Sequence, residues 1–363
     1  MVCLFINKTP KLQFMQVKQI PTGIIINDNE VIAIELTNNK GTYVQIFNYG
    51  AIINKFIVKN IKNERQDIVL GFDTFEQYLN ADYLANYPYL NTVIGRYANR
   101  IKGGEFSIAD QDYELERNSG NCTLHGGAEG FDRKLWDIVE TDNEVNASVT
   151  LQYESVDGEE GFPGDLLVEL TFELTDNDEL ILSYEAETDE DTPINLTHHI
   201  YFNLSPNGAS VNQHHLQVFA PAYLEQDEDF AVTGKVLPVA NTEFDFRTAK
   251  EIGKDCNPME GYDKSFVLNK AYGDLTLASK TSEVESGLML SVYTTEPVAH
   301  IYTGKYLDVK NAKGGKNYEA FDGFCIETQH HPNAVNIPEF PNTVLQPEDL
   351  YTQTTIFKVS LIE

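Results

Sequence analysis

The amino-acid sequence predicts an all-β fold, namely a large single-domain antiparallel β-sandwich with few short helices. Apolar side chains alternate with polar ones over many short segments, which is typical of strands with one buried face. Apolar residues at helical spacing are rare, and the one short candidate helix lies over residues 75–79. Many strands with almost no helices are typical of packed antiparallel sheets.

The candidate strands follow one another along most of the chain. They cover residues 31–36, 42–47, 149–153, 168–174, 180–186, 288–294, 298–302 and 355–361. The turn cluster Thr175-Asp176-Asn177-Asp178-Glu179 separates two of them. Because this cluster is too short for a crossover helix, the strands on either side should form an antiparallel hairpin.

One domain over residues 1–363 is the simplest organisation. The chain shows no internal repeat, no low-complexity linker and no shift in composition, and it is 42% hydrophobic, which is enough for a large core. Residues 1–20 are a candidate peripheral N-terminal extension of that domain.

The chain is strongly acidic, with 26 Lys and Arg against 56 Asp and Glu and a net charge of −30. This charge argues against nucleic acids and anionic membranes as partners and favours a neutral small ligand. No apolar stretch approaches the roughly 18 residues that span a bilayer, and no targeting segment is expected. Four scattered cysteines without CxxC pairs indicate neither a disulfide framework nor a thiolate zinc site, so we expect a reducing cytoplasm.

A histidine and a distant glutamate are a candidate acid and base. Residues 195–204 are rich in β-branched and aromatic side chains and predict a strand, in which neighbours point to opposite faces. His198 falls on the mostly apolar face, whereas His199 belongs to a polar row that has little reason to be buried unless it lines a site. Glu327 alternates with apolar neighbours in a second candidate strand, so it too can project into a cleft.

Three further motifs offer polar side chains, and each has an ordinary structural alternative. Asn99 and Arg100 can donate to vicinal hydroxyls, or the arginine can form a surface salt bridge. His125 lies in a glycine-rich turn without the features of a phosphate loop, so it fits either a bend beside a neutral ligand or a hydrogen-bonded loop. Asp263 lies in a turn-rich stretch, where it either caps the turn or accepts from a ligand hydroxyl.

Together these segments resemble the aldose 1-epimerase (galactose mutarotase) family, in the same order along most of the chain. The matching stretches are Gly95-Arg96-Tyr97-Ala98-Asn99-Arg100-Ile101, Leu124-His125-Gly126-Gly127, Gly130-Phe131-Asp132, Trp136, His199-Ile200-Tyr201-Phe202-Asn203-Leu204, Val232-Thr233-Gly234, Phe244-Asp245-Phe246-Arg247, Gly261-Tyr262-Asp263, Tyr302-Thr303-Gly304, Glu327-Thr328-Gln329 and Phe340-Pro341-Asn342. The resemblance implies a β-sandwich with a sugar cleft on a sheet face, and a monomer. It also implies that His199 is the general acid and Glu327 the general base.

The candidate substrate-binding residues are Asn99, Arg100, His125, Tyr201, Asp263 and His300. The resemblance implies four of them directly, whereas Tyr201 belongs to the polar row of His199, and His300 stands where the family commonly has glutamine. A second departure is His331-Pro332-Asn333-Ala334, where the family usually has Phe-Pro-Asp-Ala. The choice between galactose and glucose therefore stays open.

The chemistry of anomer exchange suits such a pair. The C1 hydroxyl must lose its proton while the ring oxygen gains one, which opens the ring to the aldehyde, and the ring recloses after rotation about C1–C2. A carboxylate and an imidazole, with ordinary pKa values of about 4.3 and 6.5, can perform both transfers. The mechanism uses no metal, nucleotide or covalent intermediate, so we expect no required cofactor.

Several alternatives stay open from the sequence alone. Three adjacent pairs supply six of the eight histidines, but strand neighbours point to opposite faces, so each pair offers at most one ligand to a common metal ion. Acidic runs at 189–191 and 227–229 offer either a structural Ca²⁺ site or a solvated surface. A non-catalytic carbohydrate-binding module would need no acid and base, an epimerase for phosphorylated sugars would need more cations, and a glycosidase would need two carboxylates.

Overall fold

The computed structural model describes residues 15–257 and 259–362. Within those ranges nearly all regular structure is antiparallel strand, and every strand predicted from alternation falls on an observed one. The helical segments are short: α1 (Ala81–Ala85) and the 3₁₀ turns η1 (Phe75–Leu79), η2 (Phe131–Arg133), η3 (Glu159–Gly161), η4 (Val211–Gln213), η5 (Lys313–Gly315) and η6 (Ala334–Asn336). No helix in the described ranges is long and apolar enough to cross a membrane.

The N-terminal part of the chain forms a five-stranded sheet. Its strands follow sequence order: β1 (Gln16–Ile26), β2 (Asn29–Thr37), β3 (Tyr43–Phe47), β4 (Ile52–Lys59) and β5 (Arg65–Asp67). Residues 16–20, part of the expected N-terminal extension, begin the edge strand β1 and pair with β2. Residues 1–14 of that extension lie outside the described residues.

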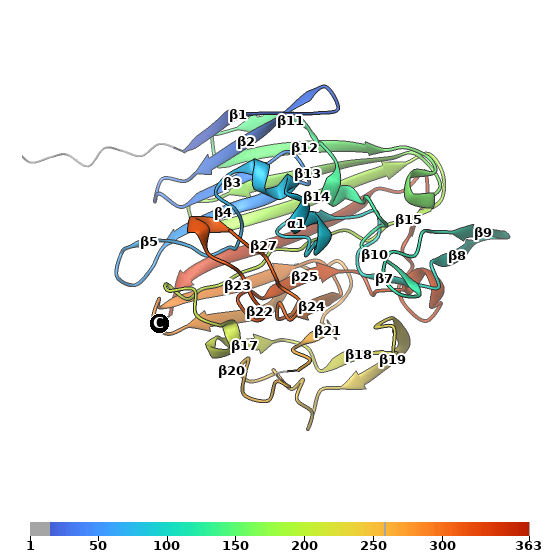
Figure 1. Ribbon diagram of the computed structural model, residues 1–363. Helices are drawn as coiled ribbons and strands as arrows, with labels where there is room; N and C mark the ends of the chain where they lie inside the picture. The colour runs from blue at the N-terminus through green and yellow to red at the C-terminus, as the bar shows by residue number, and fades with distance from the viewer. Residues whose placement is uncertain (1–14, 258, 363) are drawn as a thin grey trace, which may run out of the picture.

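A nine-stranded sheet forms the largest layer, and Figure 1 shows its long strands side by side. In spatial order its strands are β11 (Asp137–Asp142), β12 (Ala147–Ser155), β13 (Leu166–Leu174), β14 (Glu179–Thr188), β27 (Tyr351–Leu361), β23 (Leu288–Thr294), β22 (Thr276–Glu283), β17 (His215–Val218) and β20 (Lys250–Glu251). The ladder between β13 and β14 confirms the predicted hairpin.

A second five-stranded sheet carries much of the site described below. Its spatial order is β19 (Val232–Pro238), β18 (Ala222–Gln226), β21 (Asp263–Val267), β24 (Val298–Tyr302) and β25 (Cys325–Gln329). Two-stranded pairs complete the fold: β10 (Cys122–Leu124) with β7 (Arg100–Lys102), β15 (Thr192–Pro193) with β26 (Val344–Leu345), β16 (Thr197–His198) with β6 (Val93–Ile94), and β8 (Glu105–Ile108) with β9 (Gln111–Glu114).

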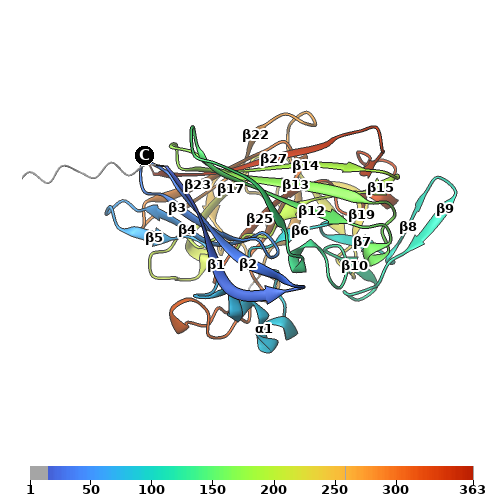
Figure 2. The same cartoon turned by 90° about the horizontal axis from the view of Figure 1, so that it is seen from above.

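One buried cluster joins the three large sheets into a sandwich. It includes Ile34 of β2, Phe172 of β13, Ile301 of β24 and Ile326 of β25. Viewed from above, β12, β13, β14 and β27 form one layer of this sandwich (Figure 2). Burying such apolar side chains stabilises the fold by roughly 1.5–3 kcal/mol each.

The position of the core also determines which residues of β24 and β25 point to the opposite face of their sheet. Ile301 and Ile326 lie in the core, so their strand neighbours His300, Tyr302 and Glu327 point to the opposite face of the sheet. This alternation places polar and titratable side chains together on the face away from the core.

The expected strand over residues 195–204 is much shorter than predicted, since only Thr197–His198 forms β16. The segment runs between several neighbours rather than along one. His199 N–H donates to the Thr92 carbonyl and Phe202 N–H to the Phe324 carbonyl. Because its backbone groups bond to separate segments, no continuous ladder forms beyond β16.

Candidate active site

One pocket brings together every residue that the sequence indicated for the site, namely Asn99, Arg100, His125, His199, Tyr201, Asp263, His300 and Glu327. Asn99 lies immediately before β7 and Arg100 begins it. The other side chains come from the turn after β10, the segment after β16, and the three strands β21, β24 and β25. The pocket has a volume of about 180 Å³.

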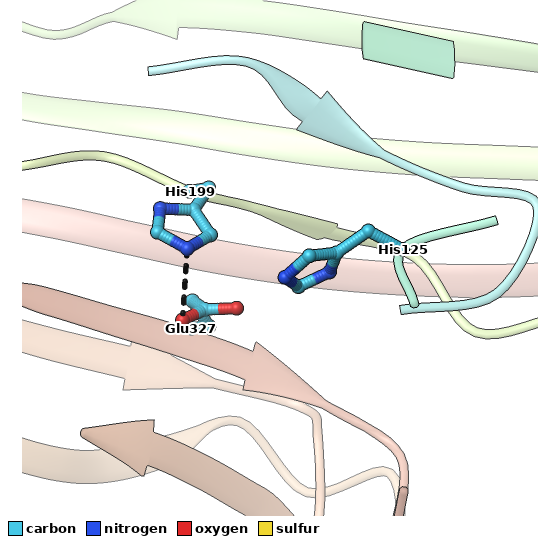
Figure 3. A group of neighbouring side chains, drawn as sticks. All are labelled: His125, His199 and Glu327. Carbon is cyan, nitrogen blue, oxygen red and sulfur yellow. Dashed lines mark ion pairs between the residues drawn. The ribbon is translucent and has the colours of Figure 1, made fainter. Parts of the chain in front are cut away.

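His199 and Glu327 face each other inside this pocket (Figure 3). The distance from His199 Nε2 to Glu327 Oε1 is 3.6 Å, and the two residues are 5% and 1% exposed. The second carboxylate oxygen, Oε2, has no hydrogen-bond partner among the described residues and points toward the His125 ring. An unpartnered buried carboxylate oxygen is available to accept from a bound molecule.

His198, by contrast, faces the core, as strand parity predicts. Its Nε2 lies 3.1 Å from the Asn91 carbonyl, and its ring packs edge-on against Phe172. Burial lowers the pKa of His198 to about 3, so it stays neutral and serves as a core residue.

Two of the three pocket histidines, His125 and His199, are shifted toward the neutral form. Burial lowers the pKa of His199, and the Glu327 carboxylate opposes that shift. Burial, followed by the neighbouring His199, lowers the pKa of His125 well below 6.5. Among the groups that favour a proton on His199, the Glu327 carboxylate has the largest effect.

His125 and Asn99 hold each other through the backbone. Asn99 N–H donates to His125 Nδ1 at 3.3 Å, and His125 N–H donates to the Asn99 carbonyl at 3.0 Å. A neutral ring that accepts at Nδ1 carries its proton on Nε2. The end of the ring opposite the backbone points toward Glu327, so His125 presents a donor to the pocket (Figure 3).

Asn99 has the left-handed φ of 63°, a conformation that asparagine tolerates better than most residues. Its side-chain oxygen accepts from Arg100 N–H at 2.9 Å. The amide NH₂ is then its remaining donor for a ligand.

Asp263, His300 and Ser265 form one hydrogen-bonded unit across β21 and β24. His300 Nε2 lies 2.9 Å from Asp263 Oδ1, and His300 Nδ1 lies 2.9 Å from Ser265 Oγ. Although burial opposes it, the hydrogen bond to Asp263 and the charge of Glu327 raise the pKa of His300 above 6.5. The pKa of Asp263 is correspondingly lowered by His300, against the effect of burial.

The two arginines of the same motif have separate roles. Arg96 is buried away from the pocket, and its guanidinium donates to Pro163, Gly164, Ser155 and Thr192. Arg100 instead lines the pocket, with its guanidinium carbon 5.4 Å from the centre of the Phe230 ring. Its Nε has no partner among the described residues. Because Arg100 lines the pocket and Arg96 does not, Arg100 is the arginine of this motif that can bind a ligand.

Aromatic side chains form the rest of the pocket, and sequence reasoning did not single most of them out. Tyr89 packs against His125 with ring centres 4.7 Å apart, and Tyr87 and Tyr302 also line the wall. Tyr201 donates from its hydroxyl to the Pro88 carbonyl at 2.9 Å and keeps its ring 4.9 Å from that of His199. The Tyr201 hydroxyl is therefore bonded to the backbone of Pro88, and its ring is the part that faces His199. The Tyr-Pro-Tyr run at residues 87–89, which forms one edge of the pocket, is the sequence feature that could have indicated these aromatic side chains.

Ligand atoms of His125, His199 and Glu327 all lie within 4.8 Å of one another, which is close enough for them to hold a metal ion. They are the one such group found among the described residues, and neither the adjacent histidine pairs nor the acidic runs form another. A ligating nitrogen must lack a proton. Since Asn99 N–H occupies Nδ1 of His125, its Nε2 carries the proton, and the set suits proton transfer better than coordination.

The fold and the pocket define an all-β protein in which a buried histidine and glutamate face each other among side chains that can form hydrogen bonds to a small polar ligand. Comparisons agree with this class. The family model for aldose 1-epimerase matches residues 33–358. The chain belongs to the aldose 1-epimerase family.

Individual relatives span almost the whole chain. Galactose mutarotase from Homo sapiens is 40% identical over 322 residues, covering 88% of this chain and 91% of that protein. Aldose 1-epimerase from Escherichia coli K12 is 33% identical over 331 residues, covering 89% and 93%.

Solved structures share the architecture. An aldose epimerase homologue from C. elegans has a TM-score of 0.84 at 31% identity and covers 92% of this chain and 100% of that one. A galactose 1-epimerase from Lactobacillus acidophilus NCFM has a TM-score of 0.84 at 26% identity, with 96% and 100% covered.

Proposed function

We propose that this protein is an aldose 1-epimerase that interconverts the α and β anomers of hexoses such as galactose or glucose. The observation that carries the proposal is the buried His199–Glu327 pair, 3.6 Å apart, in a pocket lined by hydroxyl-binding groups. The names of the relatives point to the same reaction.

In this mechanism Glu327 is the base and His199 the acid. Glu327 takes the proton of the C1 hydroxyl while His199 Nε2 gives a proton to the ring oxygen, and the C1–ring oxygen bond breaks to leave the aldehyde. After rotation about C1–C2 the two groups exchange roles and the ring recloses on the other face. Because the carboxylate favours protonation of His199, ionised Glu327 also prepares the acid.

The remaining pocket residues hold the sugar in reach of the pair. Arg100, Asn99 and the Nε2–H of His125 supply donors, and Asp263 supplies an acceptor fixed by His300. Positioning of this kind converts binding energy into rate, because both proton transfers depend on atoms lying within hydrogen-bond distance.

We also propose that no metal or other cofactor takes part, that the protein acts as a monomer, and that it acts in the cytoplasm. The tautomer of His125 supports the first point. Three described cysteines, Cys122, Cys256 and Cys325, are free thiols, which suits a reducing compartment.

Polarimetry on freshly dissolved α-D-galactose and α-D-glucose tests the proposal. The protein should accelerate the approach to the equilibrium rotation in proportion to its concentration, beyond the spontaneous rate. His215→Asn, a half-buried histidine outside the pocket, is a matched control that should keep this activity. Galactose binding by calorimetry with no acceleration for either sugar would instead support a non-catalytic sugar-binding protein.

A further inference from the structure

Tyr89 lies beside two of the pocket histidines, in the segment that joins α1 to β6. Its ring centre is 4.7 Å from that of His125, with the two ring planes at 62°, and 6.2 Å from that of His199. The Tyr89 side chain is half-buried and lines the pocket. A molecule within reach of His125 and His199 therefore also lies within reach of Tyr89.

The backbone holds Tyr89 in a conformation that a bulky residue does not favour. Its φ is 55°, in the left-handed region. The backbone N–H and the hydroxyl of Thr92 both donate to the Tyr89 carbonyl at 3.3 Å, and the Tyr201 hydroxyl donates to the preceding carbonyl, that of Pro88, at 2.9 Å. Unfavourable backbone conformations cluster at functional sites, where they place a particular side chain. Here the side chain that is placed in the pocket is that of Tyr89.

The Tyr89 hydroxyl is available to a ligand. It bonds to no described residue, whereas the Tyr201 hydroxyl bonds to Pro88 and the Tyr302 hydroxyl accepts from Tyr306 N–H at 2.8 Å. Burial raises the pKa of Tyr89 above its ordinary value of 10.0, so the phenol keeps its proton at neutral pH. A neutral phenol both donates and accepts hydrogen bonds.

We propose that Tyr89 is a further sugar-binding residue, whose ring packs against C–H groups of the hexose and whose hydroxyl forms a hydrogen bond with one sugar hydroxyl. A hexopyranose presents C–H groups and hydroxyls side by side. Tyrosine matches both, because its ring is apolar and its tip is polar. The choice of a sugar as the ligand rests on the proposed function.

Binding of galactose, measured by calorimetry, tests the contact without depending on turnover. Tyr89→Phe removes the hydroxyl and keeps the ring, whereas Tyr89→Ala removes both. Alanine is compatible with this backbone conformation, because Ala51 and Ala109 adopt φ values of 46° and 51° in the same chain. The matched control is Tyr113→Phe, which removes a hydroxyl that likewise bonds to no described residue, on a ring stacked against Phe106 outside the pocket.

Tyr89→Phe should weaken galactose binding about five-fold, as expected for one lost hydrogen bond, and Tyr89→Ala should weaken it by about a further ten-fold. Tyr113→Phe should bind galactose as wild type does. In a panel of galactoses that each lack one hydroxyl, one sugar should bind equally to wild type and Tyr89→Phe, because it lacks the hydroxyl that Tyr89 contacts.

Equal affinity of wild type and Tyr89→Phe for galactose would overturn the inference. A loss that is the same for every deoxy sugar would also overturn it, because the hydroxyl would then act on the pocket and not on the sugar. Binding by folded Tyr89→Ala as strong as that by Tyr89→Phe would overturn the ring contact. If galactose binds with the expected pattern but wild type does not accelerate anomer exchange, the proposed function fails while the Tyr89 contact stands. If wild type binds no sugar, both are wrong.

Discussion

His300 and Glu327 stand directly opposite each other in the β24–β25 ladder. Such cross-strand partners have Cβ atoms about 4.5–5.5 Å apart, so the charge of one acts on the other. His300 also bonds to Asp263, which places it between two carboxylates. The departure from the glutamine expected at this position therefore lies at the centre of the site, next to the proposed base.

The first prediction concerns His300→Gln and the pH dependence of stability. The pKa of His300 in the folded protein lies above 6.5. Its contribution to the free energy of unfolding is therefore complete below pH 6.5 and is lost as pH rises through the folded pKa. The pKa of Asp263 in the folded protein lies below 3.8, so its contribution to the free energy of unfolding is present above pH 3.8 and is lost as pH falls through the folded pKa. Urea unfolding should show the variant about 2 kcal/mol less stable near pH 5.5 and closer to wild type near pH 9. A difference in stability between His300→Gln and wild type that does not change with pH would contradict the ion pair between His300 and Asp263.

The second prediction separates the two neighbouring histidines. His199→Asn and Glu327→Gln should each lower kcat by roughly 10²–10⁴-fold, because each removes a proton-transfer group without emptying the pocket. His198→Asn should leave kcat within a few-fold and mainly lower thermal stability, because its ring packs in the core. Initial rates by polarimetry and melting temperatures check both points. If folded His198→Asn lost as much kcat as His199→Asn, the assignment of His199 as the acid and His198 as a core residue would be wrong.

The third prediction concerns the charge of His199. Since burial lowers its pKa and Glu327 raises it, Glu327→Gln should lower the His199 pKa further. An NMR titration of the His199 ring carbon in both proteins measures the shift. An unchanged or higher pKa in Glu327→Gln would show that the carboxylate does not prepare the acid.

Strand parity predicted which of the two neighbouring histidines faces the pocket, because alternation is a local property of extended backbone. His198 and His199 still point to opposite sides, although the ladder is only two residues long. The alternating strands and the facing of Glu327 were predictable for the same reason.

The roles of Arg96 and Arg100 were not predictable in this way. The partners of Arg96 lie 59 or more positions away, so only the folded chain shows that it is structural. The contact of Cys325 with His199 joins residues 126 positions apart and likewise has no local signal.

The fourth prediction concerns sugar binding. Arg100→Ala and Asp263→Asn should mainly raise KM for galactose, each by about ten-fold, because the proposed contacts of both residues are with hydroxyls present in both the ground and transition states. Isothermal titration should show matching losses of affinity. Arg133→Ala removes an arginine that stacks on the Tyr87 ring but does not line the pocket, and this control tests whether any lost cation has the same effect. Unchanged affinity in Asp263→Asn would return that residue to a purely structural role beside His300.

The last prediction is that dialysis against EDTA leaves kcat unchanged. His125, His199 and Glu327 lie close enough to suggest a metal site, but His125 accepts from Asn99 N–H at Nδ1, so its Nε2 is a donor rather than a ligand. A fall in melting temperature at constant kcat would assign an ion a structural role, because a bound ligand stabilises the folded state. If kcat is lost on chelation and one divalent ion restores it at the same folded fraction, the tautomer of His125 and the proton-transfer mechanism built on this pocket are both wrong.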